Sequence, residues 1–361
     1  MRKVILGSSH NLGVLIKKVL FWHLNYYLFK NPRPIACGIY ITNRCNLRCQ
    51  MCNIWRNPKK KTIPLVLYRN IIDDLERLGC YYVSLTGGEP LLVEDLDQRL
   101  IYAKKKIPYV HMVTNGFQID EFQAKKLART GIDEISISLD GLQKRHDTIR
   151  GVKGSFDRAW RAIENLKKHA PRIVIVVNSI ISTHNIHDLY EVSRLVRENS
   201  LLHKFQPRND HPVFEGQSTR STPVKCNREE IQEIKKFVRF ILPMENVVNS
   251  RYFLKQIPNY FSQNTMRGIF EGRCIFGYHH CEIKEDGTLF PCLTGMNWQR
   301  GFPLKEGLLN TIYSKEYRGK LEELKKCKLC KTNMYICYFE PRITFPLSHY
   351  FKYRFLEGTI R

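Results

Sequence analysis

Short apolar, β-branched runs alternate with longer amphipathic runs from residue 37 onward. The run at 64–79 puts Leu67, Ile71, Leu75 and Leu78 on one helical face and ends on Gly79 in C-cap position, so it predicts a helix. Strands are predicted at 36–42, 81–88, 109–116, 134–141, 173–182 and 203–210, and further helices at 96–106, 120–131, 155–170 and 186–199. Six strand–helix steps with apolar strands predict an α/β fold, a parallel sheet covered by helices that curls into a full or partial (βα)6 barrel.

Polar residues stand at the carboxyl ends of the predicted strands. They are Asn43, Thr86, Thr114, Ser138, Asp140 and Asn178. In a barrel of parallel strands this end carries the active site. The pattern therefore places candidate chemistry at one rim of the barrel.

Length and charge extend this picture. The chain has 361 residues, more than the roughly 100–200 of a typical domain. We expect a basic helical segment at 1–36, a core barrel at 37–250, a small cysteine-rich domain at 251–345 and a basic aromatic tail at 346–361. The 58 Lys and Arg against 34 Asp and Glu give a net charge of +24, spread along the chain. An acidic partner is expected, either nucleic acid, anionic lipid or an anionic substrate, and charge alone does not choose among them.

The N-terminal segment has two interpretations. Its longest mostly apolar run, Val19 to Phe29, contains His23 and Asn25 and is about half of the roughly 20 residues that a spanning helix needs. No small-residue cleavage site follows it, so a signal peptide is not expected. Basic residues beside several aromatic ones suit a helix lying in a membrane interface. The alternative is a helix packed on the protein's own core, and the sequence leaves both open.

Twelve cysteines fall mainly in two dense groups, which favours metal binding in a reducing, cytoplasmic compartment over a disulfide scaffold. Cys45, Cys49 and Cys52 form C-x3-C-x2-C directly after the first predicted strand. Four thiolates close a structural zinc site or a conventional [4Fe–4S] cluster, whereas three leave one metal position open to another ligand.

This three-cysteine motif resembles the signature of the radical S-adenosylmethionine (radical SAM) superfamily. "GGEP" at the end of the second strand, "VTNG" after the third and "SISLDG" after the fourth are similar to further motifs of that family, in the same order. The resemblance covers roughly residues 37–215. It implies a [4Fe–4S] cluster bound by three cysteines and S-adenosyl-L-methionine. An electron from the cluster cleaves that cofactor to a 5′-deoxyadenosyl radical, which abstracts hydrogen from a substrate. A reductant protein of the flavodoxin or ferredoxin type is the partner implied.

The resemblance also implies which residues bind the cofactor. Those assigned are Met51, Gly87, Gly88, Glu89, Pro90, Thr114, Asn115, Ser138, Asp140, Arg150 and Asn178. Backbone and Glu89 of the GGEP motif contact the amino group, Ser138 and Asp140 the ribose or methionyl part, and Arg150 the carboxylate. Met51 departs from the family, which usually has an aromatic residue there against the adenine. Taken singly, the glycines and Asp140 also suit turns or strand exits.

The second cysteine group resembles the auxiliary-cluster domains called SPASM and Twitch. Its members are Cys274, Cys281, Cys292, Cys327, Cys330 and Cys337, with a hairpin turn predicted at Asp286-Gly287. In one interpretation a Twitch-like cluster uses Cys274, Cys292, Cys327 and Cys330. In the other, Cys274, Cys281 and Cys292 hold one cluster and Cys327, Cys330 and Cys337 a second. A structural zinc is the alternative to both, because C-x2-C is also a zinc half-site.

The substrate stays open at this point. Maturation of a peptide or protein, or modification of a sugar or lipid-linked intermediate, fits the auxiliary domain. An RNA-modifying enzyme is a further hypothesis, less expected because the basic residues form no aromatic-interleaved stripe. A non-catalytic iron–sulfur or zinc protein is the remaining alternative. No general base is assigned, and His279, His280 and Glu282 are expected at the surface.

Overall fold

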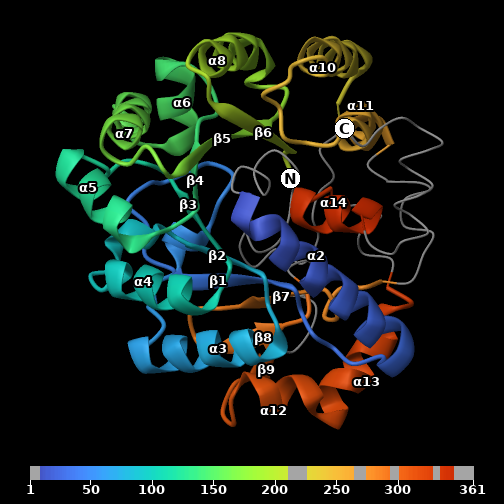
Figure 1. Ribbon diagram of the computed structural model, residues 1–361. Coiled ribbons are helices and arrows are strands. Elements are labelled where there is room, and N and C mark those ends of the chain that lie inside the picture. The colour runs from blue at the N-terminus through green and yellow to red at the C-terminus, as the bar shows by residue number, and fades with distance from the viewer. Residues whose placement is uncertain (1–8, 210–225, 264–273, 293–300, 328–333, 345–361) are drawn as a thin grey trace.

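The six predicted strands are neighbours in one sheet and follow one another in chain order. The computed structural model describes residues 9–209, 226–263, 274–292, 301–327 and 334–344. Nine strands pair in the order β6-β5-β4-β3-β2-β1-β7-β8-β9, so the sheet has edges at β6 and β9 and forms a partial barrel (Figure 1). The strands are β1 (Ala36–Thr42), β2 (Tyr82–Gly87), β3 (Tyr109–Thr114), β4 (Glu134–Ser138), β5 (Val174–Ile181), β6 (Leu202–Pro207), β7 (His280–Ile283), β8 (Thr288–Phe290) and β9 (Phe302–Pro303). From β1 to β6 all pairs are parallel, as predicted.

Helices between the strands cover the outside of the sheet (Figure 1). They are α3 (Leu65–Leu78), α4 (Leu96–Lys106), α5 (Glu121–Thr130), α6 (Gln143–Arg150), α7 (Ser155–His169) and α8 (Ile186–Glu198), with short turns η2 (Ile54–Arg56) and η3 (Pro90–Leu92). All five predicted helices are confirmed within one residue at each end, while α6 was not predicted as a helix. Gly79 ends α3 with a φ of 83°, the left-handed conformation that glycine adopts without strain.

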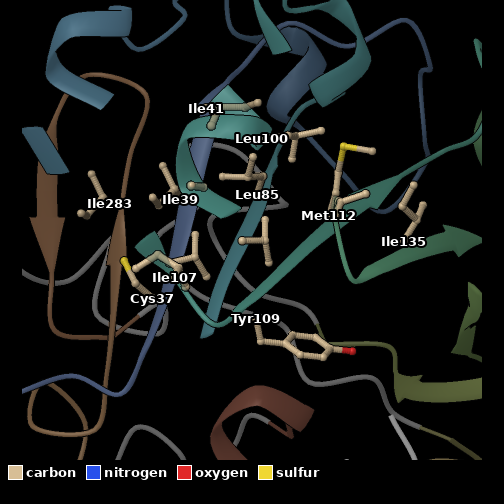
Figure 2. Close-up of a cluster of buried hydrophobic side chains, with 14 of the residues drawn as sticks. Cys37, Ile39, Ile41, Leu85, Leu100, Ile107, Tyr109, Met112, Ile135 and Ile283 are labelled. Carbon is tan, nitrogen blue, oxygen red and sulfur yellow. The ribbon is translucent and has the colours of Figure 1, made fainter. Parts of the chain in front are cut away.

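Strands β2, β3 and β4 of the barrel have one mainly apolar and one mainly polar face. Ile39, Leu85, Met112 and Ile135 belong to the buried cluster that includes Leu100 of α4, between sheet and helices (Figure 2). Because side chains alternate along a strand, the residues between them face the barrel interior. In β2, β3 and β4 those interior residues are mainly polar.

The C-terminal part extends the same sheet. β7 pairs parallel with β1, and β8 and β9 continue it antiparallel. The predicted hairpin turn is confirmed: Gly287 has a φ of 76° between β7 and β8. The remaining helices are α10 (Arg228–Ile241), α11 (Arg251–Gln263), α12 (Leu308–Tyr313), α13 (Lys315–Leu324) and α14 (Ile336–Thr344). The proposed division at residues 250 and 251 stays a prediction, and the sheet crosses it.

At the N-terminus, α2 (Ser9–Leu24) continues into η1 (Asn25–Phe29) and runs across the front of the view in Figure 1. One face packs on the protein, since Trp22 and His23 are buried and the Trp22 Nε1 donates to the carbonyl of Tyr278 at 2.9 Å. Within the described ranges, no helix combines the length and apolarity needed to cross a bilayer.

Candidate active site

The loop that carries Cys45, Cys49 and Cys52 is tied to the end of α6. The amide of Arg48 donates to the carbonyl of Arg150 at 3.0 Å, and the amide of Gln50 donates to that of Ile149 at 2.9 Å. Gly151 permits this approach, because a Cβ there would lie 2.4 Å from the Arg48 carbonyl oxygen and its φ is 70°. The "HDTIRG" segment therefore supports the cysteine loop through its backbone.

The GGEP motif is tied to the same loop from the other side. The amide of Gly88 donates to the carbonyl of Thr42 at 2.7 Å, and the amide of Glu89 donates to the carbonyl of Arg44 at 2.7 Å. A Cβ on Gly87 would lie 2.2 Å from the oxygen of Thr42, and one on Gly88 would lie 2.0 Å from that of Arg44. The two glycines thus allow close backbone contact with the chain that leads into Cys45. Besides contact with a ligand, this close backbone contact is a second reason for glycine at both positions.

Glu89 is buried at the junction of the second and third strands, with 1% of its surface exposed. Its carboxylate accepts from the Thr114 hydroxyl at 2.6 Å and from the amides of Asn115 at 2.8 Å and Leu91 at 3.1 Å. Pro90 begins η3 directly after it. Burial raises the pKa of Glu89, although these donors oppose the shift. A cationic group beside this carboxylate would offset the desolvation, which suits an ammonium ligand.

Asn115 connects the third strand to the cysteine loop. Its side-chain Nδ2 donates to the Asn46 Oδ1 at 2.8 Å, next to Cys45. The three sequence motifs after β1, β2 and β3 therefore meet in one hydrogen-bonded unit.

Arg150 and Asp140 form a buried ion pair beside Cys49. The Arg150 Nη2 lies 2.5 Å from the Asp140 Oδ2, and the side chains are 10% and 0% exposed. The Arg150 Nη1 donates to the Cys49 Sγ at 3.8 Å. Asp140 Oδ1 accepts from the amide of Ile180 at 2.8 Å. Arg150 thus already has a carboxylate partner within the chain, and Asp140 is held by two strands.

Ser138 and Asn178 complete the rim. They are direct neighbours in the register of β4 and β5, and both are half-buried. Among the described residues, the buried Asn46 Nδ2, Arg150 Nε and Asn178 Oδ1 find no hydrogen-bond partner. Buried polar atoms normally have partners, so atoms of this kind around one rim suit a polar ligand.

The three thiols have donors suited to thiolates. Burial raises the pKa of Cys45 to about 12 and of Cys52 to about 11, while the amides of Leu47 and Ile54 oppose this by hydrogen bonds to the respective sulfurs. Metal binding must therefore displace protons from these groups.

In the described part of the chain, no three His, Cys, Asp or Glu side chains converge tightly enough to hold one metal ion. A [4Fe–4S] cluster takes its cysteine ligands on separate irons, and three thiols leave one iron without a protein ligand. Met51 lies half-buried between the second and third cysteines.

The barrel interior holds a polar network that the sequence reasoning missed. His111 Nδ1 lies 2.7 Å from the Tyr82 hydroxyl, and its Nε2 lies 2.9 Å from the Ser136 hydroxyl. Tyr109 donates to Glu134 at 2.9 Å. Burial lowers the pKa of His111 to about 4, which favours the neutral imidazole, while the nearby Glu134 opposes this shift. The signal was present in "YVHMVT" and "EISIS", where polar side chains take every second position of buried strands.

His279, His280 and Glu282 are buried, with 3%, 6% and 5% of their surfaces exposed, so the prediction of surface positions is wrong. The reason is the pairing of β7 with β1, which brings this segment into the sheet. His280 Nε2 lies 2.7 Å from Glu282 Oε1. A Cβ at Gly38 of β1 would lie 2.0 Å from Glu282 Oε2, so this glycine makes room for the carboxylate.

The auxiliary cysteines separate into groups. Cys274 and Cys292 lie in one small cluster with Phe276 and Phe290, and Cys337 packs against it. Cys281 lies elsewhere, fully buried in the core between sheet and helices, with its Sγ 3.7 Å from that of Cys37.

Along β7, Cys281 faces the side opposite to His280 and Glu282. This weighs against the interpretation that groups Cys281 with Cys274 and Cys292. Cys327 packs at the edge of the main core, and Cys330 lies outside the described residues.

Comparison with known proteins gives a family for the barrel. The model of the Radical SAM superfamily matches residues 39–196. Fe-coproporphyrin III synthase of Methanosarcina barkeri is 30% identical over 208 residues, which cover 56% of this chain and 50% of that protein. Mycofactocin maturase MftC of Mycolicibacterium smegmatis is 35% identical over 166 residues, covering 45% and 41%. The matched segments thus span half or less of these curated relatives.

The fold is also similar to a solved structure. Streptococcus suis SuiB bound to the precursor peptide SuiA superposes with a TM-score of 0.64 at 19% identity, covering 92% of this chain and 77% of that one. At this identity the likeness concerns the fold.

Proposed function

We propose that this chain, whose residues 39–196 match the model of the Radical SAM superfamily, reductively cleaves S-adenosylmethionine and uses the radical to abstract hydrogen from a substrate. The observation that carries the proposal is the direct contact among the motifs. Gly88 and Glu89 bond to Thr42 and Arg44 ahead of Cys45, and Arg150 contacts Cys49. The ends of β1, β2 and α6 are thereby assembled around one thiol loop.

Cys45, Cys49 and Cys52 would hold three irons of a [4Fe–4S] cluster. When bound, this cluster with S-adenosylmethionine supplies one electron, breaks a carbon–sulfur bond and yields methionine and a 5′-deoxyadenosyl radical. Glu89 would accept from the amino group of the cofactor, supported by its burial and its position beside Thr114 and Asn115. Gly87, Pro90, Met51, Ser138, Asp140, Arg150 and Asn178 are the other proposed contacts.

The electron requires a reductant protein, for which we propose a flavodoxin or ferredoxin type. Twelve cysteines and a cluster of this kind suit a reducing compartment, which favours the cytoplasm. We further propose one auxiliary [4Fe–4S] cluster with Cys274 and Cys292 among its ligands and the others drawn from Cys327, Cys330 and Cys337. The shared packing of Cys274, Cys292 and Cys337 supports this choice over a cluster containing Cys281.

For the substrate we propose a peptide or protein that is matured. One relative is named a maturase, and the similar SuiB structure contains a precursor peptide. A tetrapyrrole is the second candidate, because the Fe-coproporphyrin III synthase relative matches over 56% of this chain.

The test uses anaerobically reconstituted, reduced protein to which S-adenosylmethionine is added. The proposal expects 5′-deoxyadenosine and methionine from the wild-type chain and none from Cys49→Ala. Cys37→Ala is the matched control, since it removes a buried thiol in the helix-facing core and leaves the proposed ligands in place. No deoxyadenosine from wild type, or equal amounts from Cys49→Ala, would contradict the proposed activity.

A further inference from the structure

The N-terminal helix presents a large apolar surface to solvent. Eleven large apolar side chains in the described part of the chain are exposed, and eight of them lie on α2 and η1. These eight, called the apolar face below, are Val14, Ile16, Leu20, Phe21, Leu24, Tyr27, Leu28 and Phe29, with 39% to 66% of their surfaces exposed. The other three are scattered singly over α3, α4 and α5. Contiguous apolar surface of this kind marks an interaction site, whereas single residues need no explanation.

The apolar face points outward because the opposite face is fixed. Trp22 is 3% exposed, donates to the carbonyl of Tyr278 and stacks on Tyr26 with ring centroids 5.0 Å apart. Lys18 Nζ donates to the carbonyls of Gly79 at 2.9 Å and Cys80 at 3.2 Å. The helix is therefore already packed on the protein's core through its other side, and the apolar face stays exposed to solvent.

The segment that carries this face has charges of one sign, while Glu76 and Glu322 of other segments lie near Lys18 and Lys30. The first 72 residues contain 13 Lys and Arg and no Asp or Glu. Lys17 lies exposed among the apolar residues, and Lys30 is exposed where η1 ends. The guanidinium of Arg33 lies 5.2 Å from the ring centre of Phe21. Apolar side chains are thus accompanied by cations that reach the same side.

We propose that the apolar face docks on an anionic lipid bilayer, with α2 lying in the plane of the interface. No described helix combines the length and apolarity needed to cross a bilayer, and the other face of α2 is committed to the protein. Anionic headgroups complement Lys17, Lys30 and Arg33. A second copy of the chain would bury the same residues but would bring two chains of net charge +24 together.

Docking in this way leaves the active site accessible from water. Gly79 and Cys80 lie just before β2, and Tyr278 lies just before β7, so α2 packs at the amino ends of these parallel strands. The cysteine loop follows the carboxyl end of β1. The lipid-facing helix and the candidate active site therefore occupy opposite ends of the barrel, and a reductant protein would approach away from the bilayer.

The test is cosedimentation of the reconstituted chain with vesicles of phosphatidylglycerol mixed into phosphatidylcholine, compared with phosphatidylcholine alone. Wild type should sediment with the anionic vesicles, less so as salt is raised, because salt screens exposed charges. The variant Leu20→Gln/Leu24→Gln/Leu28→Gln should lower the partition coefficient at least roughly tenfold, because each leucine loses apolar burial in the interface. The control Val66→Gln/Ile101→Gln/Phe122→Gln removes three equally exposed apolar side chains elsewhere and should bind as wild type.

Melting temperatures of both triple variants should match wild type, because the substituted side chains are exposed. Wild type remaining in the supernatant with anionic vesicles would overturn the proposal, and so would a helix variant that binds unchanged. Salt-insensitive binding to phosphatidylcholine alone would overturn the anionic specificity. Light scattering gives the alternative outcome. If wild type is a dimer that binds no vesicles, and the helix variant is a monomer, the apolar face is the contact with a second copy.

Discussion

Replacing Arg150 with Met tests whether the buried ion pair holds the rim of the candidate site together. Asp140 is fully buried, and its Oδ1 accepts from the amide of Ile180 while its Oδ2 lies 2.5 Å from Arg150. Arg150→Met preserves the apolar stem but leaves one carboxylate oxygen in the interior without a cation. Breaking a buried pair by removing one partner costs about 3–5 kcal/mol, a large part of the roughly 5–15 kcal/mol that stabilises a typical fold.

The assay is urea unfolding of the reduced, iron-free protein, where no cluster contributes to stability. Arg150→Met should lower the free energy of unfolding by about 3–5 kcal/mol. The double variant Arg150→Met/Asp140→Asn should lose less stability than the two single variants lose together, and the difference should be about 1–3 kcal/mol. Arg77→Met is the matched control, since Arg77 pairs with Asp74 at 3.4 Å but is 69% exposed, and it should change stability by less than about 1 kcal/mol. If Arg150→Met loses no more stability than Arg77→Met, or if the effects of Arg150→Met and Asp140→Asn are additive, the ion pair does not stabilise the rim.

Three further outcomes are expected. Gly88→Ala should prevent cluster assembly on the three-cysteine loop, because its Cβ would meet the carbonyl oxygen of Arg44 at 2.0 Å; iron retained at the wild-type level would contradict this contact. Cys281→Ala should keep the full iron content of the reconstituted chain, whereas Cys274→Ala should lose auxiliary iron; equal losses would restore Cys281 as a ligand. Burial lowers the pKa of His203 from 6.5 to about 3, so below about pH 6.5 the unfolded state binds more protons and stability falls as pH falls. Between about pH 6 and pH 4, the unfolding free energy of His203→Gln, measured in urea, should fall less steeply with decreasing pH than that of wild type, by about 1.4 kcal/mol per pH unit. An unchanged slope would show that His203 does not titrate as assigned.

Much of the barrel was predictable because its signals are local. Alternation of β-branched runs with 3.6-residue periodicity located β1 to β6 and five helices, and glycine after α3 marked the helix end. The hairpin at Gly287 was predictable for the same reason, since turn residues act within a few positions.

The missed features depend on pairing between distant segments. No local pattern shows that His280 and Glu282 join β1 more than two hundred residues away, so their burial was not predicted. The same pairing turns Cys281 toward Cys37 and away from Cys274, a side choice set by the register of one strand. The polar interior around His111 is predictable in principle, because polar and apolar residues alternate along β3 and β4.

The measurement that tests the central claim most directly is electron paramagnetic resonance of the reduced Cys274→Ala/Cys292→Ala variant, recorded before and after S-adenosylmethionine is added. These substitutions remove proposed auxiliary ligands and leave Cys45, Cys49 and Cys52 untouched. A [4Fe–4S]⁺ signal that shifts on addition of S-adenosylmethionine, and that disappears with the further change Cys49→Ala, is the predicted result. A signal indifferent to S-adenosylmethionine, or no iron–sulfur signal at all, would contradict a cluster with an iron open to the cofactor.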